Sequence, residues 1–169
     1  MGASSWTSRV PYQDDLEAAL QQAREEAYRD GDYYREEPDP RLHGLGEQEY
    51  VAVLRAEYFL DPESAREAWQ VSQAPVTGPD SLLAAQPDSG AHSVIDMTAV
   101  SRRPELGAVA PLPDEDLDRW FSTRRPDAAA VERALRNGLS GFERWSGAYV
   151  IAYAGDRPES IYFFGWSGD

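Results

Sequence analysis

The hydrophobic and polar positions of the first half of the chain follow a helical period. Between residues 14 and 30 apolar side chains recur three or four positions apart, and Gly31 follows as a stop signal. Residues 47–59 repeat this pattern, and residues 61–72 add an Asp-Pro-Glu start that caps a helix and places an acid in its first turn. The pattern therefore predicts a mostly helical region over residues 12–72.

Prolines and glycines interrupt the pattern over residues 74–90, where only one short helical turn fits. Residues 92–98 then predict a strand, because a β-rich run follows a glycine. Prolines and a glycine mark residues 101–112 as a loop. Two short amphipathic helices are predicted after it, over residues 114–122 and 127–137.

The end of the chain carries the clearest pattern. Residues 147–154 and 160–166 are two β-rich runs around a five-residue polar loop, which predicts a β-hairpin. Both faces of the second run are apolar, as is typical of a strand that is covered on both sides. A lone hairpin is marginally stable, so we expect the strand at 92–98 to join it. The run at 50–54 is either part of a helix or one more strand.

These elements predict one α+β domain over residues 1–169. N-terminal helices pack on a C-terminal antiparallel sheet of three or more strands, which ends in the hairpin 147–154 / 160–166. A length of 169 residues fits a single domain. We interpret residues 74–90 as a connection inside the domain, because neither half alone looks stable.

Charge narrows the range of partners. The chain has 30 acidic and 16 basic side chains, a formal net charge of −14. Residues 1–84 carry −10 of this and residues 85–169 carry −4. Such a surface argues against binding to nucleic acid phosphates or to an anionic membrane. The negative charge suits a basic protein partner, because it would speed the association of the two proteins. The alternative is that the acidic side chains only keep the protein soluble.

The residue inventory excludes several chemistries. There is no cysteine and no lysine, which removes thiolate metal sites, disulfides, a phosphate-loop lysine and a lysine Schiff base. His43 and His92 are the two histidines, so a three-histidine metal site is impossible. We expect no metal and no cofactor. Arginine without lysine indicates a high-GC genome, and we expect a bacterial source.

The sequence also gives an expectation for the compartment. No secretion signal opens the chain and no run of 18 apolar residues occurs, so the sequence predicts a cytoplasmic protein.

Two positions are candidates for acid–base catalysis, Asp96 and His92. Asp96 interrupts an apolar run and needs a partner if it is buried. On an extended strand His92 and Asp96 share a face while Ser93 points away, so the three cannot form a catalytic triad by themselves. Arg102 and Arg103 form a doublet that either binds an anion or forms ion pairs with neighbouring acidic side chains.

Aromatic residues gather around the predicted hairpin. Such a set is typical of a packed core, or of a ligand pocket or protein interface when its polar tips are accessible. Its members, taken here as candidate binding residues, are Trp145, Tyr149, Tyr153, Tyr162, Phe164 and Trp166.

Three functions remain open on this evidence. The first is a non-enzymatic acidic module, an adaptor or an immunity-type inhibitor that binds a basic protein. The second is a small-molecule-binding protein or enzyme, with the hairpin aromatics as a pocket wall, Asp96 or His92 as the acid–base group and the arginine doublet as an anion clamp. The third is a structural subunit that hides a sheet face in a homodimer. The lack of a catalytic motif favours the first.

Overall fold

The structure is a computed structural model that describes residues 4–37, 39–139 and 143–168. The chain divides into two compact units. The sheet unit consists of Met1–Tyr34 and Ser89–Asp169, and the helical unit consists of Arg35–Asp88. The single domain predicted over the whole chain stays a prediction.

Within its described residues the sheet unit contains one sheet of five strands. In spatial order these are β1 (Ser5–Pro11), β5 (Arg157–Trp166), β4 (Ser146–Ala154), β3 (Ala108–Pro111) and β2 (Ala99–Val100). β1 and β4 run antiparallel to β5, whereas β4–β3 and β3–β2 are parallel pairs. The predicted hairpin is thus confirmed as β4 and β5.

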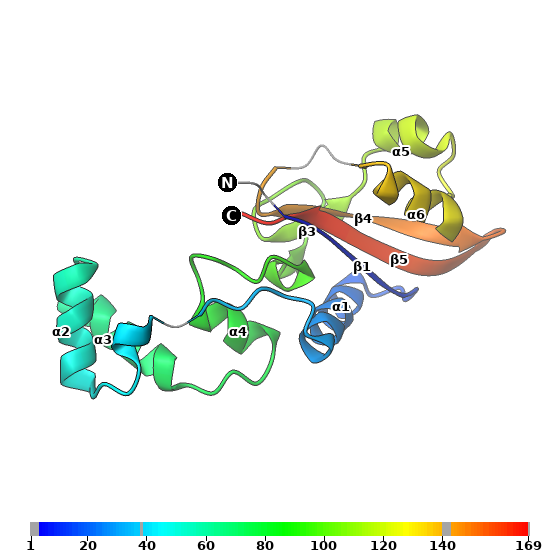
Figure 1. Ribbon diagram of the computed structural model, residues 1–169. Coiled ribbons are helices and arrows are strands. Elements are labelled where there is room, and N and C mark those ends of the chain that lie inside the picture. The colour runs from blue at the N-terminus through cyan, green and yellow to red at the C-terminus, as the bar shows by residue number, and fades with distance from the viewer. Residues whose placement is uncertain (1–3, 38, 140–142, 169) are drawn as a thin grey trace. The chain divides into compact units, whose positions relative to one another are not determined.

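Helices lie on both sides of this sheet (Figure 1). α1 (Leu16–Asp30) lies on one side together with the short 3-10 helix η2 (Val94–Asp96), which contacts α1, β1 and β5. α5 (Asp114–Phe121) and α6 (Ala128–Arg136) lie on the other side. The α+β class is confirmed, but the sheet is mixed rather than antiparallel. The chain between β3 and β4 passes through α5 and α6, a crossover of the kind that parallel neighbours need.

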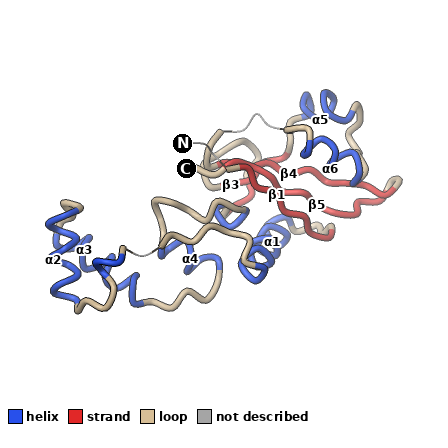
Figure 2. The backbone as a smooth tube through the Cα atoms, viewed as in Figure 1, coloured by secondary structure: helices blue, strands red, loops and turns tan. Residues whose placement is uncertain are grey.

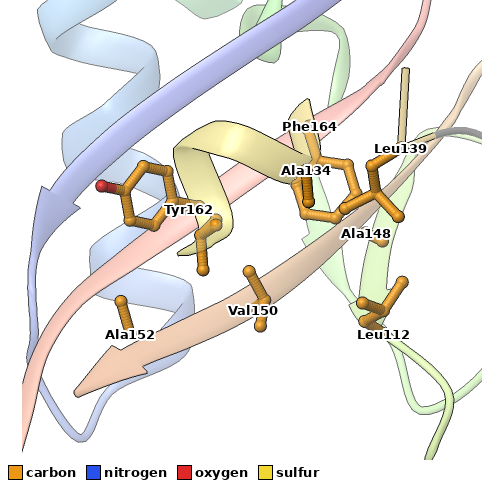
Figure 3. Close-up of a cluster of buried hydrophobic side chains, with 9 residues drawn as sticks. Leu112, Ala134, Leu139, Ala148, Val150, Ala152, Tyr162 and Phe164 are labelled. Carbon is orange, nitrogen blue, oxygen red and sulfur yellow. The ribbon is translucent and has the colours of Figure 1, made fainter. Parts of the chain in front are cut away.

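The core beneath α6 follows the alternation of the two hairpin strands. Figure 3 shows small side chains of β4, among them Ala148 and Val150, beside Tyr162 and Phe164 of β5 and facing α6. Every residue of β5 from Ser160 to Gly165 is buried. The predicted cover on both faces of this strand is therefore present.

α1 ends at Asp30, as the sequence predicts, and begins at Leu16, two residues after the predicted start at residue 14. The Asp15 carboxylate accepts a hydrogen bond from the Ala18 N–H at the first turn, and Gly31 closes the helix in the left-handed region at φ 73°. Ala19, Leu20 and Ala23 lie on its buried face. Local capping and the apolar stripe agree here, and the prediction holds.

The predicted strand at 92–98 is wrong. Val94–Asp96 form η2, and β2 is limited to Ala99–Val100. The Ser93 hydroxyl accepts from the Ile95 N–H, and the Asp96 carboxylate accepts from the Ser93 N–H. These side-chain bonds offer the backbone an alternative to a sheet ladder and override the β propensity of Val94 and Ile95.

Two strands were not predicted. β1 alternates buried Trp6 and Val10 with exposed Ser5, a short period-two signal near the start of the chain. β3 falls in the predicted loop 101–112, where its prolines and glycine concealed it. The run at 50–54 lies in a helix, which settles that alternative.

The helical unit consists of a 3-10 turn and three short helices in its described residues. Its core is small. The buried apolar side chains include Leu54, Ala65 and Leu82, which come from three different helices. The elements are η1 (Pro40–Leu42), α2 (Glu47–Glu57), α3 (Pro62–Gln73) and α4 (Pro79–Ala85). α2 and α3 contact each other and lie side by side in Figure 2.

Among the described residues, no helix has the length and apolarity needed to cross a membrane.

Close contact of β1 with the hairpin requires glycine at position 165. A Cβ there would come within 2.5 Å of both the Trp6 ring and the Ser146 carbonyl oxygen. We expect Gly165→Ala to lower the free energy of unfolding by about 1–3 kcal/mol, as overpacking of a filled core does. Urea denaturation followed by tryptophan fluorescence measures this. An unchanged midpoint would contradict the close approach of Trp6.

Candidate functional site

Asp96 is buried in the loop that leads into the sheet. Its Oδ1 accepts a hydrogen bond of 2.6 Å from the Ala91 N–H, and its Oδ2 accepts a longer one of 3.4 Å from the Ser93 N–H. Burial raises the pKa of this carboxyl, and the two backbone donors oppose that rise. The carboxylate thus closes residues 91–96 on themselves, which is a structural use of an acid.

His92 stands next to Asp96 but in an unusual conformation. Its backbone is left-handed, at φ 51°, and its ring stacks on Tyr34 with centroids 4.6 Å apart. The Tyr34 N–H also donates to the Ala91 carbonyl at 2.7 Å. The two candidate acid–base residues are therefore neighbours in a tight loop, rather than partners along one face of a strand.

The arginine doublet lies apart from that loop. Arg102 and Arg103 are exposed in the connection between β2 and β3. Neither forms an ion pair with another described residue. Leu106 in the same connection is 76% exposed. Asp96 accepts its hydrogen bonds from Ala91 and Ser93 instead.

The hairpin aromatics divide between the two faces of the sheet. Tyr149 lies on the side of α1, tilted against Phe163 at a centroid distance of 6.2 Å, and burial raises the pKa of its phenol. Tyr153 follows an irregularity in the strand register, and the guanidinium of Arg125 lies over its ring at 5.7 Å. Tyr162, Phe164 and Trp166 belong to the opposite face, since neighbours alternate along a strand.

Tyr162 is held under α6 by a specific contact. Its hydroxyl donates to the Glu132 carboxylate at 2.9 Å, and Arg9 of β1 lies over its ring at 5.2 Å. Burial, helped by that acceptor, raises the pKa of Tyr162 to about 12. The phenol therefore stays protonated and acts as a core residue with a satisfied polar tip.

Trp145 lies outside both faces. Its backbone is left-handed at φ 60°, and its indole lies against Gly90 and Gly168, where any Cβ would overlap it. The backbone N–H of Trp145 donates to the Trp166 carbonyl at 3.1 Å, and the backbone carbonyl of Trp145 accepts from the Gly107 N–H at 2.7 Å. Trp145 therefore ties the start of β4 to three loops.

Phe164 and Trp166 line a hollow of about 260 Å³ at the end of the sheet. Ser5 and Thr7 of β1 and Leu135 of α6 also contribute to its walls. No described residue around the hollow has an acidic or basic side chain. Asp96, His92 and the arginine doublet are not among the residues that line this hollow.

No group of three or more potential metal ligands occurs among residues 4–37, 39–139 and 143–168.

The helical unit presents the most unusual surface of the molecule. Tyr58, Phe59 and Leu60 follow one another between α2 and α3, with exposed fractions of 48%, 89% and 37%. Phe59 has a left-handed backbone at φ 59°. For a bulky side chain that conformation costs about 1–3 kcal/mol and is typical of functional loops. We call these three residues the apolar tip.

A polar network holds the apolar tip in place. Arg41 donates to both oxygens of the Asp39 carboxylate, at 2.7 Å from Nη2 and 3.1 Å from Nε. The Tyr58 hydroxyl donates to the same carboxylate at 2.8 Å. These donors, the guanidinium above all, hold the pKa of Asp39 well below its usual range. Arg41 also pairs with Glu57, so the network holds the two residues that come directly before Phe59.

The helical unit is also the more acidic part of the chain for its length. Residues 35–88 contain eleven acids and four arginines, a net charge of −7, which is half of the total of −14. The apolar tip therefore stands in a negative field.

The comparisons with known proteins add no family. Neither a protein-family model, nor a curated protein, nor a solved structure shows significant similarity to this chain.

Sequence reasoning missed the apolar tip because it extended the helix at 47–59 through Tyr58 and Phe59. The signal was present in the sequence. Three large apolar residues stand directly before an Asp-Pro helix start, where neither helix can bury them. The polar network was hidden as well, since its acid and its arginine lie in a proline-rich loop.

The raised pKa of Asp96 predicts a pH effect on stability. The folded-state pKa lies above the ordinary value of 3.8, so the contribution of this group is full below that value and is lost as the pH rises through the raised pKa. Asp96→Asn removes the titration. We expect the free energy of unfolding of the wild type, minus that of the variant, to fall as the pH rises from below 3.8 through the raised pKa. A difference that rises with pH would contradict burial as the dominant cause.

Proposed function

We propose that the protein is a non-enzymatic binding module for a basic protein, in the manner of an adaptor or an inhibitor. The helical unit supplies the binding surface. The observation that carries the proposal is Phe59, an aromatic side chain that is 89% exposed and held in a left-handed conformation, in a unit of net charge −7.

The chemistry of the apolar tip supports this role. Aromatic anchors that enter a partner's pocket supply most of the binding energy in many interfaces. Phe59 has Tyr58 and Leu60 beside it, so one turn offers three such side chains. The bonds of Tyr58 to Asp39 restrict the turn before any partner arrives, which reduces the entropy that binding must cost.

The charge of the unit supports a basic partner in particular. A net charge of −7 on residues 35–88 raises the rate of encounter with a positive surface and disfavours an acidic one. This effect acts through solvent, so salt weakens it over a Debye length of about 8 Å at physiological ionic strength. Binding of the proposed kind is therefore sensitive to salt in its association rate.

The candidate catalytic groups favour a binding module over an enzyme. The Asp96 carboxylate spends its lone pairs on backbone N–H groups of its own loop. The arginine doublet lies in a different connection. A general acid or base needs to reach a substrate proton, and these residues do not converge on one hollow.

Capture from the native lysate tests the proposal. Wild type, Phe59→Ala and Leu106→Ala are immobilised, and bound proteins are quantified by mass spectrometry at low and at high salt. We expect one dominant basic protein on the wild type, lost at high salt. Phe59→Ala should reduce its capture about 30-fold, which corresponds to a hot-spot contribution of about 2 kcal/mol.

Leu106→Ala is the matched control, because it removes an apolar side chain that is 76% exposed in the sheet unit and leaves the charge unchanged. Its capture should equal that of the wild type. Equal loss in both variants, an acidic dominant partner, or no dominant partner would each refute the proposal.

A further inference from the structure

The helical unit contains a groove that the apolar tip does not form. It lies along α3 and the end of α4 and has a volume of about 310 Å³. α3 turns one helical face toward it, including Glu67, Ala68 and Val71, while Ala84 and Ala85 come from α4. None of the three tip residues lines it. The groove is thus a separate feature of the same unit.

The unit's own core leaves this face of α3 uncovered. α3 uses Ala65 for the core and Trp69 for its contact with Tyr50 of α2, at a centroid distance of 5.2 Å. Ala68 and Val71 are only half-buried, on the neighbouring side of the helix. The mostly apolar floor that results faces an open groove rather than packed side chains.

Secondary structure points to a helix as the occupant. The described part of residues 35–88 is helix, turn and loop, with no strand edge to which an extended peptide could add. Alanine at three of the lining positions lets a second helix approach closely, within the 8–10 Å that separates the axes of packed helices. An amphipathic helix would lay its apolar face on this floor.

The negative charge of the groove and of the helical unit favours a basic helix as the occupant. Glu67 is the one charged side chain among the described residues that line the groove, and none of the unit's four arginines does. The unit as a whole carries −7. A helix with Lys or Arg along the edges of its apolar face therefore complements the groove, and one with acidic edges is repelled.

We propose that this groove binds a basic amphipathic helix of the partner protein, with leucine-like side chains over Ala68, Val71 and Ala84 and a cationic side chain at Glu67. The inference rests on the proposed function, which it deepens by naming the segment that is recognised. The apolar tip and the groove then make two separate contacts with the partner.

The test uses the full chain and a fluorescein-labelled helical peptide of leucine and lysine, about 15 residues long, with leucine on one face. A second peptide of equal length and charge has alanine in place of leucine. Fluorescence anisotropy at low salt gives both affinities. We expect the leucine peptide to bind at least tenfold more tightly. Equal affinities would mean attraction by charge alone and would overturn the groove.

Two tryptophan variants locate the binding. Ala84→Trp fills the groove at an exposed position of α4 and should weaken the leucine peptide at least tenfold. Ala56→Trp adds the same side chain at an exposed position of α2 outside the groove and should change nothing. Circular dichroism verifies that both variants fold. Equal effects of the two variants would overturn the proposal.

If Ala84→Trp does not fold, Val71→Ser replaces it, since this change makes the floor polar without adding bulk. The same tenfold loss is expected, and an unchanged affinity would overturn the groove. Phe59→Ala should leave peptide binding intact, because the tip lies outside the groove. Failure of the groove together with intact Phe59-dependent capture removes this inference alone, whereas failure of both removes the proposed function too.

Discussion

The stretch of strand β5 from Ser160 to Gly165 has no side that faces water. Its residues are buried without a break, between β1 and β4 in the sheet and between helices above and below. A strand of this kind is stable only if both faces are covered, so the rest of the sheet unit is arranged to cover it. α6 serves one face, and α1 with η2 serves the other.

That constraint explains the chemistry of the loop before β2. The segment from Gly90 to Met97 has to lie against the sheet and α1, which buries its backbone. Buried N–H groups need acceptors, and Asp96 supplies two. Asp96, a catalytic candidate in the sequence, thus accepts hydrogen bonds from the backbone of its own loop. In the helical unit, by contrast, a small core leaves large side chains and charge at the surface.

Sequence periodicity predicted what one short stretch of chain decides by itself. The two-faced apolar character of residues 160–166, the helical period of residues 14–30 and the stop at Gly31 are local signals, and each led to the right element. η2 was mistaken for a strand because propensity favours Val94 and Ile95 in a sheet, while the decisive bonds come from Ser93 and Asp96 beside them. β3, only four residues long, depends on a partner far away in the chain.

The candidate site was harder to predict for the same reason. The sequence analysis grouped Tyr149 and Tyr162 in one aromatic set, and only the fold shows that Glu132 accepts a hydrogen bond from the Tyr162 hydroxyl. Phe59 was assigned to a helix that ends at Glu57, and exposure of a side chain depends on what fails to cover it. Absence of a neighbour leaves no mark in a local pattern.

The two segments of the sheet unit that border residues 35–88 in sequence contact each other. Tyr34, the last residue before the unit, donates to Ala91 and stacks on His92, which stand just after it. These contacts join the two segments of the sheet unit to each other, and residues 35–88 form an insertion between them. Insertions at such junctions are tolerated because the host core does not depend on them. Residues 35–88 can therefore change in evolution while the sheet unit stays the same.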